Sequence, residues 1–323
     1  GAGTDIEGYN KLSRFTIIGG EANYVVLENT GELTVVAKTS AKNTTIDTGG
    51  KLIVQKEAKT DSTRLNNGGV LEVQDGGEAK HVEQQSGGAL IASTTSGTLI
   101  EGTNSYGDAF YIRNSEAKNV VLENAGSLTV VTGSRAVDTI INANGKMDVY
   151  GKDVGTVLNS AGTQTIYASA TSEKANIKGG KQTVYGLATE ANIESGEQIV
   201  DGGSTEKTHI NGGTQTVQNY GKAINTDIVS GLQQIMANGT AEGSIINGGS
   251  QVVNEGGLAE NSVLNDGGTL DVREKGSATG IQQSSQGALV ATTRATRVTG
   301  TRADGVAFSI EQGAANNILL ANG

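Results

Sequence analysis

Apolar and polar side chains alternate in short segments that recur from one end of the chain to the other. After Gly31 the alternation places Leu33 and Val35 on one side and Glu32 and Thr34 on the other. The same pattern returns every 16 to 19 residues, with one interval of 38 that is two periods. The glycines that precede it, here called the marker glycines, are Gly31, Gly50, Gly69, Gly88, Gly126, Gly145, Gly162, Gly180, Gly196, Gly213, Gly231, Gly249, Gly268 and Gly287. A period of two residues predicts a strand with one buried face, and a short repeat along a whole chain is typical of a solenoid.

A second apolar pattern follows the first in most repeats. An alanine, a few polar residues and an aliphatic pair recur, as from Ala136 to Ile141 and from Ala259 to Leu264. No stretch shows a convincing 3.6-residue period, which disfavours repeats that contain helices. Coils of about 18 residues with two or three short strands are typical of the parallel β-helix. The sequence therefore predicts an all-β fold, a right-handed parallel β-helix of about seventeen coils, as a single domain over residues 1–323.

Three repeats depart from this pattern and share a phenylalanine. Phe15, Phe110 and Phe308 each follow a Gly-containing segment and precede an aliphatic run, and the usual strand halfway through the coil is absent. We interpret each as an insert coil with a longer loop and a phenylalanine that plugs the core; a ligand-binding loop is the alternative. The insert coils are expected near residues 1–31, 88–126 and 287–323.

The segment 162–253 replaces one inward apolar residue of each coil with glutamine. The six glutamines stand two residues after successive marker glycines: Gln164, Gln182, Gln198, Gln215, Gln233 and Gln251. Identical amides stacked in register can hydrogen-bond one another along the coils, which removes the cost of burying them. We therefore predict an inward glutamine ladder; a substrate-binding groove lined by amides is the alternative.

Composition excludes several functional classes. Glycine makes up 48 of 323 residues, and proline, cysteine and tryptophan are absent. The lack of proline suits a continuous strand ladder, and the lack of cysteine excludes disulfides, zinc fingers and thiol nucleophiles. A net charge of −10 argues against a nucleic-acid partner. No apolar run approaches the length of a membrane span, and no signal peptide is recognisable, so we expect a mature piece or a fragment.

The residues that would support enzymatic chemistry are not grouped in the sequence. Glycoside hydrolysis needs two carboxylates roughly 5–9.5 Å apart, which on this fold means acids on nearby coils. On the best-aligned strand no two outward acids fall on neighbouring coils. His81 and His209 are far apart and stand in no catalytic motif, and no metal-ligand spacing or calcium-binding nonapeptide occurs. We predict no catalytic residue, cofactor or metal, and hence no enzyme.

Several phrases resemble a known family. The segments Asn211 to Val217, Asn247 to Val253 and Asn265 to Val272 are similar to the passenger repeats of the self-associating autotransporter adhesins, the group of AIDA, antigen 43 and TibA, and TibA-like passengers are nearest. The stretch from Gly287 to Ile310 resembles the insert coils of those passengers. The resemblance implies a passenger on the bacterial cell surface that binds copies of itself on neighbouring cells, supports biofilm formation and adheres to an unidentified host-cell receptor.

The resemblance also implies O-glycosylation with heptose by a dedicated transferase. We expect modification at exposed turns beside marker glycines, and the candidate sites are Ser86, Ser160, Ser195 and Ser230. These serines equally suit turns through local hydrogen bonds alone. Two other functions remain open from the residues: a polysaccharide-degrading enzyme on the same fold, and a passive stalk that holds another domain away from the cell.

Overall fold

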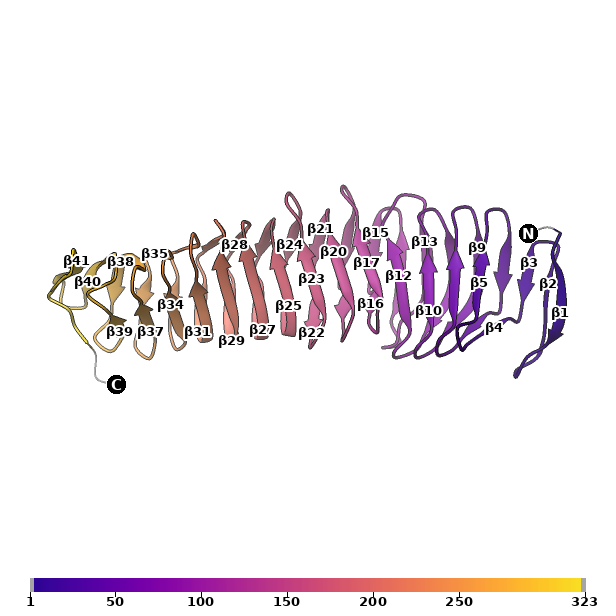
Figure 1. Cartoon of the computed structure of the whole chain (residues 1–323), viewed down its shortest axis with the longest axis horizontal. Coiled ribbons are helices and arrows are strands. Elements are labelled where there is room, and N and C mark those ends of the chain that lie inside the picture. The colour runs from indigo at the N-terminus through magenta and orange to yellow at the C-terminus, as the bar shows by residue number, and fades with distance from the viewer. Residues whose placement is uncertain (1–2, 321–323) are drawn as a thin grey trace. The chain divides into compact units, whose positions relative to one another are not determined.

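The computed structural model describes residues 3–320, which form strands and turns and contain no helix. The chain divides into two compact units, residues 1–164 and 165–323. In each unit short strands follow one another in coils joined by tight turns (Figure 1). The single domain and the residue limits of the insert coils stay predictions, and residues 1–2 and 321–323 of the outer insert coils lie outside the described residues.

Each coil offers up to three strands, here named A, B and C in chain order from the marker glycine. The A strands are β5 (Glu32–Val35), β8 (Lys51–Val54), β10 (Val70–Val73), β12 (Ala89–Ser93), β17 (Ser127–Val130), β20 (Lys146–Val149), β23 (Thr163–Ile166), β34 (Ser250–Val253), β37 (Thr269–Val272) and β39 (Ala288–Ala291). The B strands are β3 (Glu21–Asn23), β6 (Ser40–Lys42), β15 (Glu116–Lys118), β18 (Arg135–Val137), β21 (Lys152–Val154), β24 (Thr171–Glu173), β26 (Leu187–Thr189), β28 (Ser204–Glu206), β30 (Lys222–Ile224), β32 (Thr240–Glu242) and β35 (Leu258–Glu260). The C strands are β4 (Val26–Leu27), β7 (Thr45–Ile46), β16 (Val121–Leu122), β19 (Ile140–Ile141), β22 (Val157–Asn159), β33 (Ile245–Ile246) and β36 (Val263–Leu264).

Some strands run through a corner. B and C are continuous in β9 (Lys59–Leu65), β11 (Glu78–Gln84) and β38 (Ser277–Gln283). C continues into the next A strand in β25 (Asn176–Val184), β27 (Asn192–Asp201), β29 (His209–Gln218) and β31 (Asp227–Ile235). These last four lie in the second unit, where the coils are shortest.

Each strand pairs in parallel with the equivalent strand of the next coil, so equivalent residues stack. Leu33 pairs with Leu52, and Leu52 with Leu71. Leu52 and Leu71 have no exposed surface, as expected for an alternating strand with one face in the core. This stacking confirms the all-β, parallel β-solenoid fold. The number of turns is about 15 rather than about seventeen, because hairpins in the insert coils use chain without completing a turn.

The insert coils contain antiparallel strands. Their strands are β1 (Asp5–Tyr9) with β2 (Arg14–Ile18), β13 (Leu99–Thr103) with β14 (Ala109–Arg113), and β40 (Arg297–Arg302) with β41 (Ala307–Glu311) and β42 (Ala314–Asn316). Phe110 and Phe308 are 2% and 3% exposed, and each lies opposite a glycine, Gly102 or Gly300. A Cβ at Gly300 would approach the Phe308 ring to 2.6 Å, so the ring occupies the space that the missing side chain leaves.

All six glutamines of the ladder point inward and are at most 1% exposed. In the second unit Gln198 Nε2 donates to Gln182 Oε1 at 2.8 Å, and Gln215 Nε2 donates to Gln198 Oε1 at 2.8 Å. The row continues with Gln233 to Gln215 at 2.8 Å and Gln251 to Gln233 at 2.6 Å. The predicted orientation and bonding are thereby confirmed over these residues.

A row of corner hydroxyls completes the glutamine ladder. Thr226, Ser244 and Ser262 donate to the carbonyl oxygens of Gln215, Gln233 and Gln251 at 3.2, 2.9 and 2.8 Å. In two coils of the first unit that have leucine instead of glutamine, the equivalent hydroxyls of Thr44 and Thr139 are buried without a partner. The ladder therefore satisfies two sets of buried polar groups, the amides and the hydroxyls beside them.

Candidate interaction and modification surface

The four candidate serines fall into two structural classes. Ser86 and Ser160 are exposed and lie in turns, closed by hydrogen bonds from Gly88 N to Gln85 O at 3.0 Å and from Gly162 N to Asn159 O at 2.9 Å. Ser195 lies within β27 and Ser230 within β31, so the expectation that these two occupy turns is wrong.

The reason for the difference is the length of the corner. Four residues, such as 47–50, join strands C and A where a turn forms. Only three residues join them at Ser195 and Ser230, which is too short for a four-residue turn, and the chain passes through as a bulged strand with a register shift. Ser195 is exposed, whereas Ser230 is half-buried and donates to Asn211 Oδ1 at 3.3 Å.

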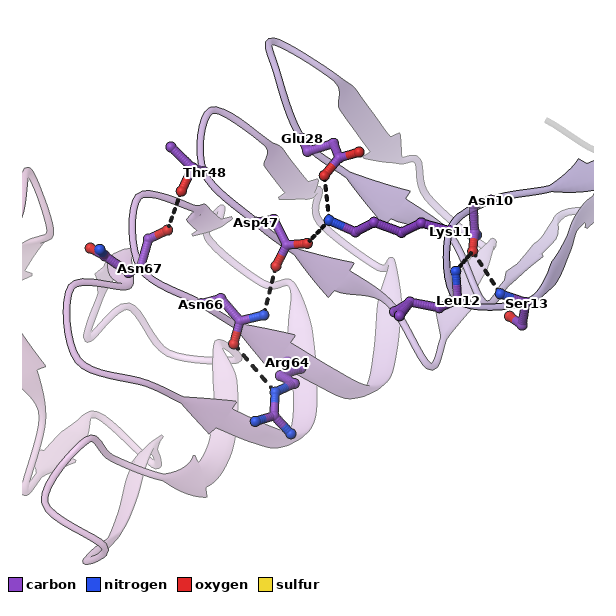
Figure 2. Close-up of polar contacts among 10 residues, drawn as sticks. All are labelled: Asn10, Lys11, Leu12, Ser13, Glu28, Asp47, Thr48, Arg64, Asn66 and Asn67. Carbon is purple, nitrogen blue, oxygen red and sulfur yellow. Dashed lines mark hydrogen bonds and ion pairs between the residues drawn. The ribbon is translucent and has the colours of Figure 1, made fainter.

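Polar side chains stack along the same corner. In Figure 2, Asp47 accepts hydrogen bonds from Asn66 Nδ2 at 2.7 Å and from Lys11 Nζ at 2.6 Å, and Lys11 also binds Glu28. Lys11 followed by Asn66 lowers the pKa of the Asp47 carboxyl, and Asp47 followed by Glu28 raises the pKa of Lys11. Lys11 thus joins the loop of the first insert hairpin by ion pairs to two successive coils of the first unit.

The second insert hairpin reaches the same corner. Asn142 Nδ2 donates to the Tyr106 hydroxyl at 3.1 Å and to Glu123 Oε2 at 2.8 Å, and Asn159 Nδ2 donates to Asn142 Oδ1 at 2.8 Å. Because these bonds join the same turn position on successive coils, they form a polar row with both donors and acceptors along one edge of the first unit.

The outward residues of the B strands in the first unit form charged rows. Lys42 pairs with Glu21 at 2.8 Å, and Arg135 pairs with Glu116 at 3.1 Å. Lys59 lies 3.7 Å from Glu78. Lys42 is the largest cause of a lowered pKa at the Glu21 carboxyl. All these side chains are substantially exposed, so each pair adds little stability but the alternating charges remain accessible to a partner.

Register also brings acids and histidines beside partners that the sequence does not reveal. Glu242 of β32 pairs in register with Glu260 of β35, an acid pair on neighbouring coils, but Lys222 binds Glu242 at 2.7 Å. His81 Nδ1 lies 2.8 Å from Asp61 Oδ1, and His209 Nδ1 lies 3.0 Å from Asp227 Oδ2. The two histidines are surface residues, each within hydrogen-bond distance of an aspartate that sequence reasoning missed.

Within residues 3–320, no group of three His, Asp or Glu side chains is arranged to hold a metal ion. The described chain also has no helix long and apolar enough to cross a membrane.

A solved structure shows which family has this architecture. The crystal structure of a TibC-catalysed hyper-glycosylated TibA fragment superposes with a TM-score of 0.60 at 30% sequence identity, covering 85% of this chain and 98% of that one. The chain belongs to the autotransporter adhesin passengers. The family model described as adhesin of bacterial autotransporter system, probable stalk, matches residues 7–69 and 101–162. The predicted resemblance to TibA-like passengers is thus confirmed.

Two curated relatives place this passenger segment within longer proteins. It is 99% identical over 322 residues to the probable autotransporter YpjA of Escherichia coli K12 and covers 21% of that protein. It is 41% identical over 56 residues to the autotransporter adhesin/invasin TibA of Escherichia coli O78:H11, which is 17% of this chain and 6% of TibA. The chain therefore spans about a fifth or less of the curated relatives that it matches.

Proposed function

We propose that this passenger segment mediates cell–cell self-association on the bacterial surface, and thereby biofilm formation and host-cell adhesion, rather than catalysis. The observation that carries the proposal is the alternation of charge along the exposed B strands of the first unit, as in Glu21, Lys42, Lys59, Glu78 and Arg135. A second copy laid along these strands meets opposite charges at several positions, and many weak contacts on one scaffold add up.

Self-association is tested by sedimentation of the purified chain at low and high salt. We expect association at low salt and dissociation at high salt, because exposed charges are screened. The charge reversals Lys59→Glu and Lys80→Glu together should abolish it, since both side chains lie in these charged rows. Lys178→Glu with Lys181→Glu is the matched control: it changes the net charge equally, in the second unit, and should leave association intact. A chain that stays monomeric throughout, glycosylated or not, would instead be a passive stalk.

We further propose that a dedicated transferase adds heptose to exposed hydroxyls of this segment. The support is the likeness to TibA, whose fragment was glycosylated by TibC. Co-expression with TibC followed by peptide mass spectrometry should find sugar on Ser86, Ser160 and Ser195, and less on Ser230, which is half-buried and hydrogen-bonded. Ser172 is 1% exposed and serves as the internal negative control. Sugar confined to strand-centre threonines would exclude corner exposure as the selecting feature.

A further inference from the structure

Asp153 is a fully buried carboxylate at a position where neighbouring coils have small side chains. It is the central residue of β21, is 0% exposed, and pairs in register with Ala136 of β18. The second insert coil has Ile100 in register with Ala79, and the other coils of the first unit have alanine or threonine at this inward position: Ala22, Ala41, Thr60, Ala79, Ala117 and Ala136. Burying a carboxylate is costly unless hydrogen-bond donors surround it, so its presence here calls for a donor that the other coils lack.

The donors come from two neighbouring residues. Thr156 Oγ1 donates to Asp153 Oδ1 at 2.6 Å, and Gln164 Nε2 donates to Asp153 Oδ2 at 2.7 Å. Gln164 Nε2 also lies 3.3 Å from the sulfur of Met147. Gln164 is the first of the six ladder glutamines along the sequence, and Asp153 Oδ2 is an acceptor for its amide.

The ladder amides all donate in one direction along the chain. In the second unit the Nε2 groups of Gln198, Gln215, Gln233 and Gln251 each donate to the glutamine that precedes by 16 to 18 residues, and Gln182 Nε2 donates to the preceding Ser172 Oγ at 3.2 Å. Gln164 follows the same rule, because its partners Asp153 and Met147 also precede it. The coil that precedes the coil of Met147 and Asp153 has Leu128 in register with Met147, and Ala136 in register with Asp153. Leucine and alanine side chains contain no acceptor, so a glutamine facing them would lose its partner.

We propose that Asp153 is a positioning residue that caps the first glutamine of the row and fixes the direction in which its amide donates. The physical basis is the one that places acidic residues at the N-terminus of a helix, where aligned dipoles present unsatisfied N–H groups. A hydrogen bond in a dry core is electrostatically stronger than one in water. Met147 supplies a second, weaker acceptor at the same end.

A double-mutant cycle on the full chain tests the proposal. Asp153→Ala should lower the thermal midpoint by several degrees, because Gln164 and Thr156 lose their acceptor. Asp153→Ala combined with Gln164→Leu recreates the inward residues of the preceding coils and should recover at least half of that loss. If the double variant is no more stable than Asp153→Ala, or if Asp153→Ala costs nothing, the proposal is wrong. Glu32→Ala, at an exposed outward acid of β5, is the control and should leave the midpoint nearly unchanged.

A second readout reports the hydrogen bond itself and covers the case in which Asp153→Ala does not fold. Asp153→Asn keeps one oxygen for Gln164 and offers its NH₂ group to the Thr156 hydroxyl, so it should be clearly more stable than the alanine variant. In a glutamine-¹⁵N spectrum the Gln164 side-chain amide should exchange slowly in the wild type and shift on Asp153→Asn, while the Gln251 amide stays in place. Equal damage from both substitutions, or an unshifted Gln164 signal, would assign Asp153 a packing role and overturn the proposal.

Discussion

Gly145→Ala is expected to destabilise the protein by about 3 kcal/mol, the upper range for forcing an extra methyl group into a packed core. A Cβ at Gly145 would lie 2.2 Å from the carbonyl oxygen of Leu122 and 2.6 Å from its carbon. Both are backbone atoms of the preceding coil, and they cannot rotate away as a side chain can. Relief requires the two coils to separate, which would stretch the parallel hydrogen bonds between β16 and β19.

The measurement is urea denaturation of the variant against the wild type, with Gly133→Asn as the control. Gly133 also lies in a turn of the first unit, at a φ of +80°, but no atom lies within 4 Å of its missing Cβ. Asparagine tolerates the left-handed conformation, so this variant should change stability by less than about 1 kcal/mol. If Gly145→Ala denatures at the wild-type midpoint, close stacking of the coils is not what requires the marker glycines.

Gln215→Leu should cost about 3 kcal/mol although it makes the core more apolar. Gln215 donates to Gln198 Oε1 and accepts from Gln233 Nε2, both at 2.8 Å. It also accepts from Thr226 Oγ1 at 3.2 Å. Leucine leaves the Gln233 amide and the Thr226 hydroxyl without this acceptor, and each unsatisfied buried group costs roughly 1–3 kcal/mol.

Gln234→Leu is the matched control for this substitution. Gln234 is the next residue after Gln233 in β31, faces outward, and donates to Thr216 Oγ1 at 2.9 Å. Removing it takes one donor from the buried Thr216 hydroxyl, which still donates to Glu197 Oε1 at 3.4 Å, so thermal unfolding should change little. A Gln215→Leu variant that melts at or above the wild-type temperature would mean that the apolar gain outweighs the loss of the ladder bonds.

The coil architecture could be predicted from the sequence because a solenoid is held together by neighbours one period apart. The alternation after each marker glycine identifies the inward residues. When the same residue type stands at this position in successive coils, its copies stack on one another, so each member of the glutamine row could be predicted. The number of coils was overestimated because the hairpins of the insert coils, such as β13 with β14, use chain without completing a turn.

Features that depend on register between different strands could not be predicted. Ser195 and Ser230 look like turn residues in the sequence, but a corner one residue shorter turns them into strand residues. His209 and Asp227 are 18 residues apart and become neighbours only when their strands align. Asp153 gave no signal because most acidic residues of the described chain are solvated, and nothing in the sequence distinguishes Asp153 from them.

The insert coil that contains Phe110 changes how far local unfolding can spread along the first unit. Elsewhere each coil hydrogen-bonds only to the coils before and after it, so an end can fray one coil at a time. Around Phe110, β13 binds both β11 and β14, and β14 binds β15, so these strands must come apart together. Unfolding from an end of the unit should therefore pause at the insert coil. The hairpin then determines how many residues unfold together in the next step.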